Sequence, residues 1–538
     1  MKRRFLFLAL AILLISGSCV SPSKPEPTPT STPISAPTPT LAPTLIPSPS
    51  PTVARGQDGV LRLLGEDEDI ETWDPHRTES STTHRPLSFI YSKLFRLPES
   101  DGPVPYDRPP LPDLVERWEM TSPTTYVFHL RRGVRFHDKP PVSGRELVAE
   151  DVRYSLDRFR NSSLPSRAWW RAVDSIEAPD PYTVRINLSE PFAPLLFYLG
   201  GHFSWVLARE VDDAARSTPA GAIGTGPWFL KDYVPGARAV FQRNPAYFVP
   251  GLPYVEEIQW QMVKDTLTRR AALVSGLLDV MPVDKGLLAE LKQGAPDLQV
   301  YEYIPLWGPG AQALAMRSDV PPFADVKVRR AVSLSFHRPA WRDTFLPGGG
   351  VDNALRQAQD NAAPVPAVLG WGLTLEQLGV AGRYSRFDVA QAQQFLAEAG
   401  YPKGLAIYLN FPQDRGYERK VEVLADFLLA VGITAELRSL SEGDYLKAVR
   451  GDYEGILFYS LPSLLEPDEW FFLQHSVAGG RNVSHARDPS LDEMLKRQAG
   501  LMDKKQRSEA LEAIQKYVAE QVYYLYLPSA PQLEVSSP

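Results

Sequence analysis

The sequence predicts a mixed α/β protein whose mature part folds into two or three subdomains. Beyond the N-terminal leader and a proline-rich segment, about 485 residues remain, which is too many for a single hydrophobic core. Apolar residues alternate along some segments, as in half-buried strands, and recur at helical spacing along others. No repeat with a period of 20–50 residues is present, which argues against a solenoid or a propeller.

In the first half, a strand is expected at residues 60–64 and a polar loop at residues 80–84. Residues 126–130 alternate as a strand, and the turn at residues 131–133 predicts a hairpin with residues 134–136. An amphipathic helix and a further strand follow: the helix carries Val148, Val152, Leu156 and Phe159, and the strand covers residues 182–188 with Val184, Ile186 and Leu188 on one face.

The second half mixes helices and strands. Glycines and prolines mark the ends of several of these elements. Helices are expected at residues 389–399, 421–429 and 508–518, and strands at residues 405–409, 434–437, 455–459 and 522–527.

Composition restricts the class of protein. Apolar residues make up 43% and charged residues 22%, which is typical of a soluble globular protein. A net charge of −7 argues against a nucleic-acid partner. With a single cysteine, Cys19, the folded part contains no disulfide. No stretch after Cys19 is long and apolar enough to cross a membrane.

The N-terminus has the parts of a bacterial export signal. Residues 1–4 are positively charged, residues 5–15 are apolar, and small residues precede Cys19. The arrangement resembles a lipoprotein signal in which Cys19 is lipidated, although Ser16 stands where leucine is usual. An ordinary secretory signal is the alternative. Residues 21–53 contain eleven prolines and predict an extended tether.

The order of segments in the mature chain resembles solute-binding protein family 5, the extracytoplasmic binding proteins of peptide, dipeptide and nickel ABC importers. The matching segments run from about residue 61 to residue 527 in the family's order. They are residues 114–119, 126–138, 149–158, 180–188 with Glu190-Pro191-Phe192, Gly224-Thr225-Gly226-Pro227-Trp228 with residues 243–247, 325–331, 397–402, and the C-terminal helix and strand.

The resemblance implies a periplasmic-binding-protein-like bilobal fold of type II, cluster C, with an extra subdomain in the first lobe. The lobes would be joined by two strand crossovers and would close on a ligand. The expected parts are a signal peptide at residues 1–18, a lipidated tether at 19–56, lobe I at 57–84, 205–283 and 483–538, the extra subdomain at 85–204, and lobe II at 284–482.

The resemblance also places candidate ligand-binding residues. One loop would face the ligand, and several aromatic residues would lie where the family builds its cleft; any one of these aromatic residues is as well explained by core packing. The candidates are Ser81, Thr82, Thr83, His84, Trp307, Trp371, Tyr459, Ser463 and Trp470. The turn at residues 224–227 is expected to be structural.

Two departures bear on the ligand. Peptide-binding members have an aspartate that holds the α-ammonium group of the peptide, and Ser463 stands in its place. His337 stands before Arg338 where the family usually has aspartate. An oligopeptide, an oligosaccharide or another polar solute therefore stays open as the cargo.

Rival functions have weaker support. No His-Glu-x-x-His, Gly-x-Ser-x-Gly or phosphate-binding loop is present, and Glu466 and Asp468 beside Pro467 indicate a turn or helix cap. We therefore expect no enzyme, cofactor or metal site, while a surface hydrolase, a nickel-complex binder and a sensor without transport remain alternatives. The expected partners are an ABC permease with its ATPase and, through the lipid, the outer face of the cell membrane; the protein is expected to be a monomer.

Overall fold

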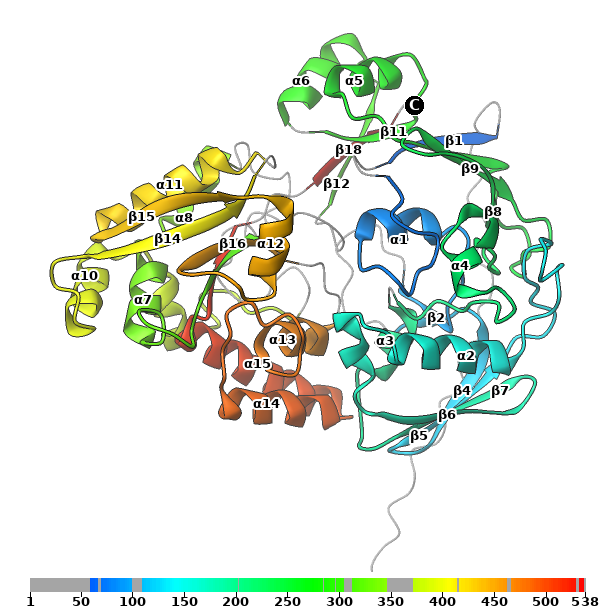
Figure 1. Cartoon of the computed structure of the whole chain (residues 1–538), viewed down its shortest axis with the longest axis horizontal. Coiled ribbons are helices and arrows are strands. Elements are labelled where there is room, and N and C mark those ends of the chain that lie inside the picture. The colour runs from blue at the N-terminus through cyan, green and yellow to red at the C-terminus, as the bar shows by residue number, and fades with distance from the viewer. Residues whose placement is uncertain are drawn as a thin grey trace, which may run out of the picture. The chain divides into compact units, whose positions relative to one another are not determined.

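The computed structural model describes residues 59–65, 69–98, 109–201, 203–283, 285–295, 297–303, 312–345, 371–413, 416–461, 466–528 and 532–536. These residues form two large sheets, two smaller ones and the helices that cover them (Figure 1). The mixed α/β class expected from the sequence is confirmed. Within the described ranges, no helix is both long enough and apolar enough to cross a bilayer.

The first large sheet has seven strands and holds both early and late parts of the chain. β1 lies near its middle and runs parallel to β10 and β11, while the remaining pairs are antiparallel. The order is β12 (Gln299–Tyr303), β18 (Gln532–Ser536), β11 (Val280–Val283), β1 (Val60–Leu64), β10 (Glu257–Gln261), β9 (Arg238–Arg243) and β8 (Trp228–Val234).

The second large sheet has five strands, which come from the second half of the chain. Strands β13 and β16 and the edge strand β17 are buried almost without interruption, as expected for a sheet covered on both faces. The order is β15 (Ile433–Leu440), β14 (Leu405–Pro412), β16 (Ile456–Ser460), β13 (Gln312–Met316) and β17 (Tyr524–Leu527).

The chain passes between the two large sheets twice. β12 belongs to the seven-stranded sheet and β13 to the five-stranded sheet, and the return runs from β17 to β18. Strand pairing therefore puts one crossing between β12 and β13 and the other between β17 and β18. The lobe boundaries expected at residues 283/284 and 482/483 remain a prediction, and strand pairing supports moving both of them toward the C-terminus.

The chain between β1 and β8 forms a four-stranded antiparallel sheet. Its order is β4 (Val115–Ser122), β5 (Thr125–Leu130), β7 (Thr183–Leu188) and β6 (Val173–Asp180), and a small pair joins β2 (Phe95–Arg96) to β3 (Leu111–Pro112). The alternation that predicted β5 and β7 is confirmed, because every second residue of both strands is buried. Phe128 pairs with Trp118 on one side and Val184 on the other.

The expected hairpin between residues 126–130 and 134–136 is wrong. Both edges of β5 are already occupied, by β4 and β7, so no edge is open to a following strand. Val134 and Phe136 are instead buried in the core beside the sheet, and Arg135 forms only an isolated bridge with Glu146.

Helices surround the sheets. The helices predicted near residues 148–159, 389–399, 421–429 and 508–518 are confirmed as α2, α10, α11 and α15. The α-helices are α1 (Ser81–Leu87), α2 (Ala149–Arg160), α3 (Leu195–Gly200), α4 (Asp213–Arg216), α5 (Thr266–Val274), α6 (Lys285–Gly294), α7 (Val326–Ser335), α8 (Arg338–Phe345), α10 (Val389–Glu398), α11 (Glu418–Ala430), α12 (Glu442–Val449), α13 (Pro467–His475), α14 (Pro489–Gly500) and α15 (Lys504–Gln521), with 3-10 helices η1 (Pro165–Trp170), η2 (Pro219–Gly221) and η4 (Gly379–Ser385).

The polar loop expected at residues 80–84 is also wrong, because these residues begin helix α1. Ser80 is the N-cap, and its side chain accepts a hydrogen bond from the Thr83 backbone N–H at 3.4 Å. A serine hydroxyl satisfies one of the N–H groups that the first turn leaves open. The polar side chains that suggested a loop therefore include the cap of a short helix.

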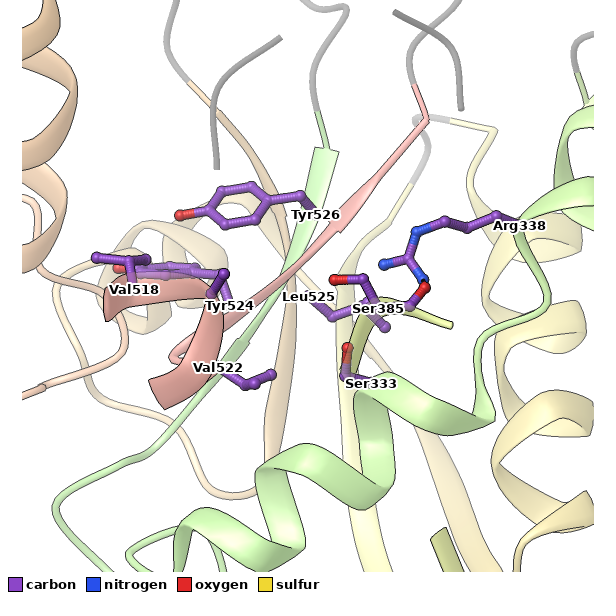
Figure 2. Close-up of a pocket in the computed structure, with 9 residues that line it drawn as sticks. Ser333, Arg338, Ser385, Val518, Val522, Tyr524, Leu525 and Tyr526 are labelled. Carbon is purple, nitrogen blue, oxygen red and sulfur yellow. Dashed lines mark hydrogen bonds between the residues drawn. The ribbon is translucent and has the colours of Figure 1, made fainter. Parts of the chain in front are cut away.

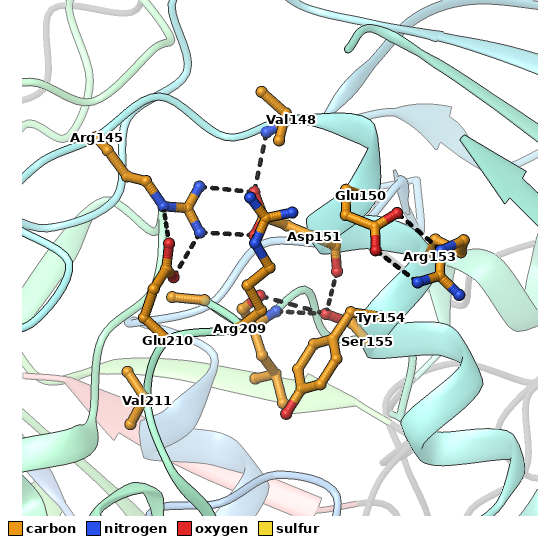
Figure 3. A network of polar contacts seen from close by, with 12 residues as sticks. Arg145, Val148, Glu150, Asp151, Arg153, Tyr154, Ser155, Arg209, Glu210 and Val211 are labelled. Atoms are coloured by element: carbon orange, nitrogen blue, oxygen red, sulfur yellow. Dashed lines mark hydrogen bonds and ion pairs between the residues drawn. The ribbon is translucent and has the colours of Figure 1, made fainter. Parts of the chain in front are cut away.

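A buried carboxylate fixes the start of α2. Asp151 accepts from the Val148 N–H at 3.0 Å and from two nitrogens of Arg145 at 2.6 and 2.7 Å (Figure 3). Arg145 also donates to both oxygens of Glu210. Ser155, one turn further along α2, accepts from the Leu207 N–H at 2.8 Å. These contacts hold α2 against the segment that follows α3.

Residues 224–227 form the turn that leads into β8, as expected. Two glycines in this turn, Gly224 and Gly226, let its backbone lie close to the backbone of Ile90. The Gly226 N–H donates to the Ile90 carbonyl at 2.7 Å. A Cβ on Gly224 would lie 2.1 Å from that same Ile90 oxygen. Only glycine fits such an approach of two backbones.

Gly224→Ala is therefore expected to lower the free energy of unfolding by about 3 kcal/mol, because a backbone and not a flexible side chain would have to move. Urea unfolding measures this change. Gly443→Ala, in α12 with open space around the added carbon, is the matched control and should leave the midpoint unchanged or slightly higher. Equal midpoints for the two variants would contradict the close approach.

Candidate functional site

A polar cluster connects the segment before α1 with the chain after α13. Glu79 accepts hydrogen bonds from the Ser166 N–H at 2.8 Å and from the Ser166 hydroxyl. Its second oxygen pairs with Arg481, which lies 402 residues away in sequence. Arg481 also interacts with the hydroxyl of Tyr459 on β16. The segment before α1, the helix η1, the chain after α13 and strand β16 thus meet around one carboxylate.

The charge of Glu79 is stabilised at this place. Burial by itself would raise the pKa of the carboxyl, but the positive charge of Arg481 and the hydrogen bonds from Ser166 outweigh it, so the pKa lies below its usual value. Burial raises the pKa of the Tyr459 phenol. The cluster is therefore an ionised carboxylate–guanidinium pair beside a neutral phenol.

A second buried carboxylate belongs to Asp468 in α13. Arg171 donates to both oxygens of Asp468 at 2.7 Å, and the Tyr198 hydroxyl and the Gln498 amide donate at 2.7 and 2.5 Å. The Arg171 guanidinium also stacks 3.8 Å from the ring of Phe472. Arg171 follows η1, so this pair joins the part of the chain that contains the four-stranded sheet to α13.

The sequence indicates a turn or a helix cap at Glu466, and the structure shows a helix cap. Glu466 is the N-cap of α13, and its carboxylate accepts from the backbone N–H groups of Asp468 and Glu469 at 2.5 and 3.3 Å. Arg507 pairs with its other oxygen. Burial raises the pKa of Glu466, and the charge of Arg507 opposes that shift. The acidic pair at residues 466 and 468 is thus bound in structural contacts.

Neutral hydrogen-bonding groups near these ion pairs have unused capacity. The indole nitrogens of Trp169, Trp170, Trp371 and Trp470 are buried and have no partner among the residues that the structure describes. The same holds for both amide atoms of Gln474, whose side chain is fully buried. Trp470 and Gln474 are four residues apart in α13 and share one face of the helix. Buried polar atoms without partners are costly, so this set marks a place where a bound molecule could supply hydrogen bonds.

Three of the predicted ligand residues belong to one apolar cluster. Tyr459 and Trp470 are buried members of it, and Trp371 packs against it, with its ring 5.9 Å from that of Phe471. The cluster contains residues of the four-stranded sheet as well as of the five-stranded sheet. Trp307 and Ser463 lie outside the described residues.

The remaining predicted residues, 81–84, lie in α1. The Thr83 hydroxyl accepts from the Glu71 N–H at 3.2 Å. His84 accepts through Nδ1 from the Trp205 indole at 3.1 Å, so its Nε2 carries the proton and donates to the Thr78 carbonyl at 3.0 Å. Burial lowers the pKa of His84 to about 4, so the ring is neutral. The hydrogen bonds of these two side chains support the fold, and a role of residues 81–84 in binding stays a prediction.

Sequence reasoning missed Glu79, Arg171, Arg481 and Gln474. Ion pairs between residues hundreds of positions apart leave no local pattern. The adjacent tryptophans Trp169 and Trp170 were the one available signal for an aromatic region at this place. Within the described ranges, no group of three or more His, Cys, Asp or Glu side chains is placed to hold a metal ion.

The Glu79–Arg481 pair predicts a pH dependence of stability. Because the folded state lowers the pKa of Glu79, the pair stabilises the protein above the usual carboxyl pKa of about 4.5, and this contribution is lost as the pH falls below it. At pH 7, Glu79→Gln should destabilise the protein by about 3 kcal/mol because Arg481 loses its partner.

Chemical unfolding at pH 7 and at decreasing pH values below 4.5 measures this. The difference between wild type and Glu79→Gln should shrink as the pH falls. Glu177→Gln removes a half-exposed pair with Arg185 and is the control, with a much smaller change at pH 7. A constant difference across this pH range would show that Glu79 is not held as a carboxylate.

Comparison with known proteins agrees with this architecture. The family of bacterial extracellular solute-binding proteins, family 5 middle, matches residues 109–482. The dipeptide-binding protein of Escherichia coli (strain K12) is 27% identical over 444 residues, covering 77% of this chain and 78% of the relative. Heme-binding protein A of Haemophilus influenzae is 25% identical over 466 residues, covering 79% and 82%.

The fold is also that of a solved binding protein. The periplasmic binding protein DppA from Helicobacter pylori, in complex with the peptide STSA, superposes with a TM-score of 0.72 at 21% identity, covering 89% of this chain and 94% of that one. The structural neighbours are bilobal periplasmic binding proteins, which confirms the fold class expected from the sequence. With the family match across residues 109–482, these findings show that the chain belongs to the family 5 extracellular solute-binding proteins, which serve as the substrate-binding components of ABC importers.

Proposed function

We propose that this protein is a lipid-anchored binding protein that captures a peptide-like or other polar solute between its lobes and delivers it intact to an ABC permease. The observation that carries the proposal is the set of buried indole and amide groups around α13 that have no partner among the described residues, beside the Glu79–Arg481 and Arg171–Asp468 pairs. Indole and amide N–H groups pair with carbonyl or hydroxyl oxygens, which peptides and oligosaccharides both offer.

The charged side chains near this set are already paired with each other, which favours recognition of the solute by neutral groups. Glu79, Asp468 and Glu466 each already have an arginine partner. A solute that binds beside them therefore gains most from hydrogen bonds to the indoles and the Gln474 amide and from stacking on aromatic rings. Relatives named for dipeptides support a peptide-like cargo, and a relative named for heme keeps larger ligands open.

We expect the lobes to close on the ligand near the same contacts. Glu79 with Arg481 and Arg171 with Asp468 join the chain between β1 and β8 to the chain between β16 and β17. A ligand that contacts both sides adds binding energy only when these segments approach, so it shifts the population toward the closed state. The radius of gyration should decrease when the cargo is added.

Native mass spectrometry of the purified protein tests the cargo directly, followed by a melting-temperature screen across peptides, oligosaccharides and metal chelates. A solute that binds and is then released without chemical change would support capture for transport. Turnover of the solute would favour the surface hydrolase, and no ligand from any of these classes would remove the support for uptake. A permease and an ATPase encoded beside the protein would separate uptake from sensing.

For the solute that binds, Trp470→Phe should weaken the affinity by about five- to tenfold, because the ring stays but one hydrogen-bond donor is lost. Titration calorimetry measures the change. Trp228→Phe is the matched control: Trp228 lies in β8 of the seven-stranded sheet and its indole donates to the Val255 carbonyl before β10, so its loss should alter stability and not affinity. Equal affinities for wild type and Trp470→Phe would remove this indole from the site.

Cys19 supplies the anchor in this proposal. Mass spectrometry of the N-terminal peptide should find Cys19 carrying fatty acids, and the protein should fractionate with membranes. Cys19→Ser should move the protein to the soluble extracytoplasmic fraction while its ligand-induced melting shift is retained. An unmodified Cys19 in membrane-free protein would favour the ordinary secretory signal.

A further inference from the structure

A pocket inside the body built around the five-stranded sheet contains one buried positive charge. Its walls come from α7, α8, η4, α15 and β17 (Figure 2). Figure 2 shows the Arg338 guanidinium and the Ser333 hydroxyl directed toward the pocket, with the Ser385 side chain beside them. Val518, Val522 and Leu525 make the opposite wall apolar.

The guanidinium of Arg338 is poorly satisfied. Arg338 is only 6% exposed, and its one hydrogen bond to a described residue runs from Nη1 to the Ser385 carbonyl. Its Nε is buried without a partner in the described part of the chain. Burial lowers the pKa of Arg338 to about 9, and no carboxylate of the described residues offsets this effect.

Two other buried arginines have carboxylate or carbonyl partners, whereas Arg216 resembles Arg338 in that its described hydrogen bonds all come from one nitrogen, Nη2. Arg171 has the carboxylate of Asp468. Arg329, also buried, donates to the carbonyls of Gln521 and Phe323 at 2.9 and 2.7 Å. No carboxylate of the described residues forms an ion pair with Arg338, which has only the ring of Phe336 at 5.1 Å in addition to Ser385. An unpaired buried charge costs several kcal/mol, so an anion bound beside Arg338 would stabilise the fold.

The residue before Arg338 does not supply that charge. His337 accepts a hydrogen bond through Nδ1 from the Ala340 N–H at 3.0 Å and so caps α8 with a neutral nitrogen. The serines of the pocket add hydroxyl groups that can donate to an anion. One guanidinium, two hydroxyl groups and an aliphatic wall match a small ion with a single negative charge.

We propose that this pocket binds a small monoanion, such as chloride or formate, through Arg338 Nε and the hydroxyl groups of Ser333 and Ser385. The anion completes the packing of α7, α8, η4 and β17 and stabilises the fold. This site is independent of the cargo site, and its occupancy does not depend on the transport function.

Crystals grown in sodium bromide test the site. Anomalous scattering at the bromine edge should give a peak within hydrogen-bonding distance of Arg338 Nε. In solution, replacing gluconate, which is too large to enter, by chloride at equal ionic strength should raise the melting temperature by about 1–2 °C. A peak without this solution effect would mean binding at crystal concentration only and would overturn the proposal.

Arg338→Met should abolish the chloride dependence, whereas Arg329→Met should lower the melting temperature and keep that dependence. Where Arg338→Met fails to fold, Ser385→Ala and Ser333→Ala provide the same comparison and should reduce the chloride effect. No bromide peak, or a carboxylate of the protein itself seated against Nε, would show that the pocket is not an anion site.

Discussion

The fully buried carboxylate of Asp468 constrains the rest of the structure. A buried negative charge is tolerated only when it is paired and its oxygens are hydrogen bonded. Asp468 meets this requirement through Arg171, which lies 297 residues away, together with Tyr198 and Gln498. The four-stranded sheet and α13 must therefore come together for α13 to be stable in this position.

That requirement also shapes the candidate site. The same helix carries Glu466, which caps its start, and Trp470 and Gln474, which have unused hydrogen-bonding capacity within the described residues. Because the charged side chains of this region are occupied by each other, the neutral groups are the ones left for a bound molecule. The chemistry of the site follows from which groups the fold has already satisfied.

Local patterns in the sequence were enough to predict several individual strands and the start of one helix. Alternation found β5 and β7, and Glu466 beside Pro467 indicated a turn or a helix cap. The helix at residues 81–87 was missed because its threonines and Pro86 resemble a loop, while its stability comes from the Ser80 cap and from buried contacts of Thr83 and His84. The false hairpin has a similar origin, since alternation shows which residues are buried and not which strands pair.

The site was predictable only in part. The family resemblance pointed to Trp371, Tyr459 and Trp470, and these three residues share one cluster. The resemblance did not point to Arg171, Arg481 or Glu79, because pairing over such distances depends on the tertiary fold. The sequence did show that His337 replaces the usual aspartate before Arg338, but it did not show that Nδ1 of His337 would cap α8.

The position of β18 has a consequence for biosynthesis. This last strand lies between β11 and β12, so among the described strands β12 reaches the seven-stranded sheet only through residues 532–536. The ribosome must therefore release nearly the whole polypeptide before this sheet can be completed. A chain cut short by a premature stop codon near residue 530 would leave β11 with an open edge, the kind of surface that recruits other chains into aggregates.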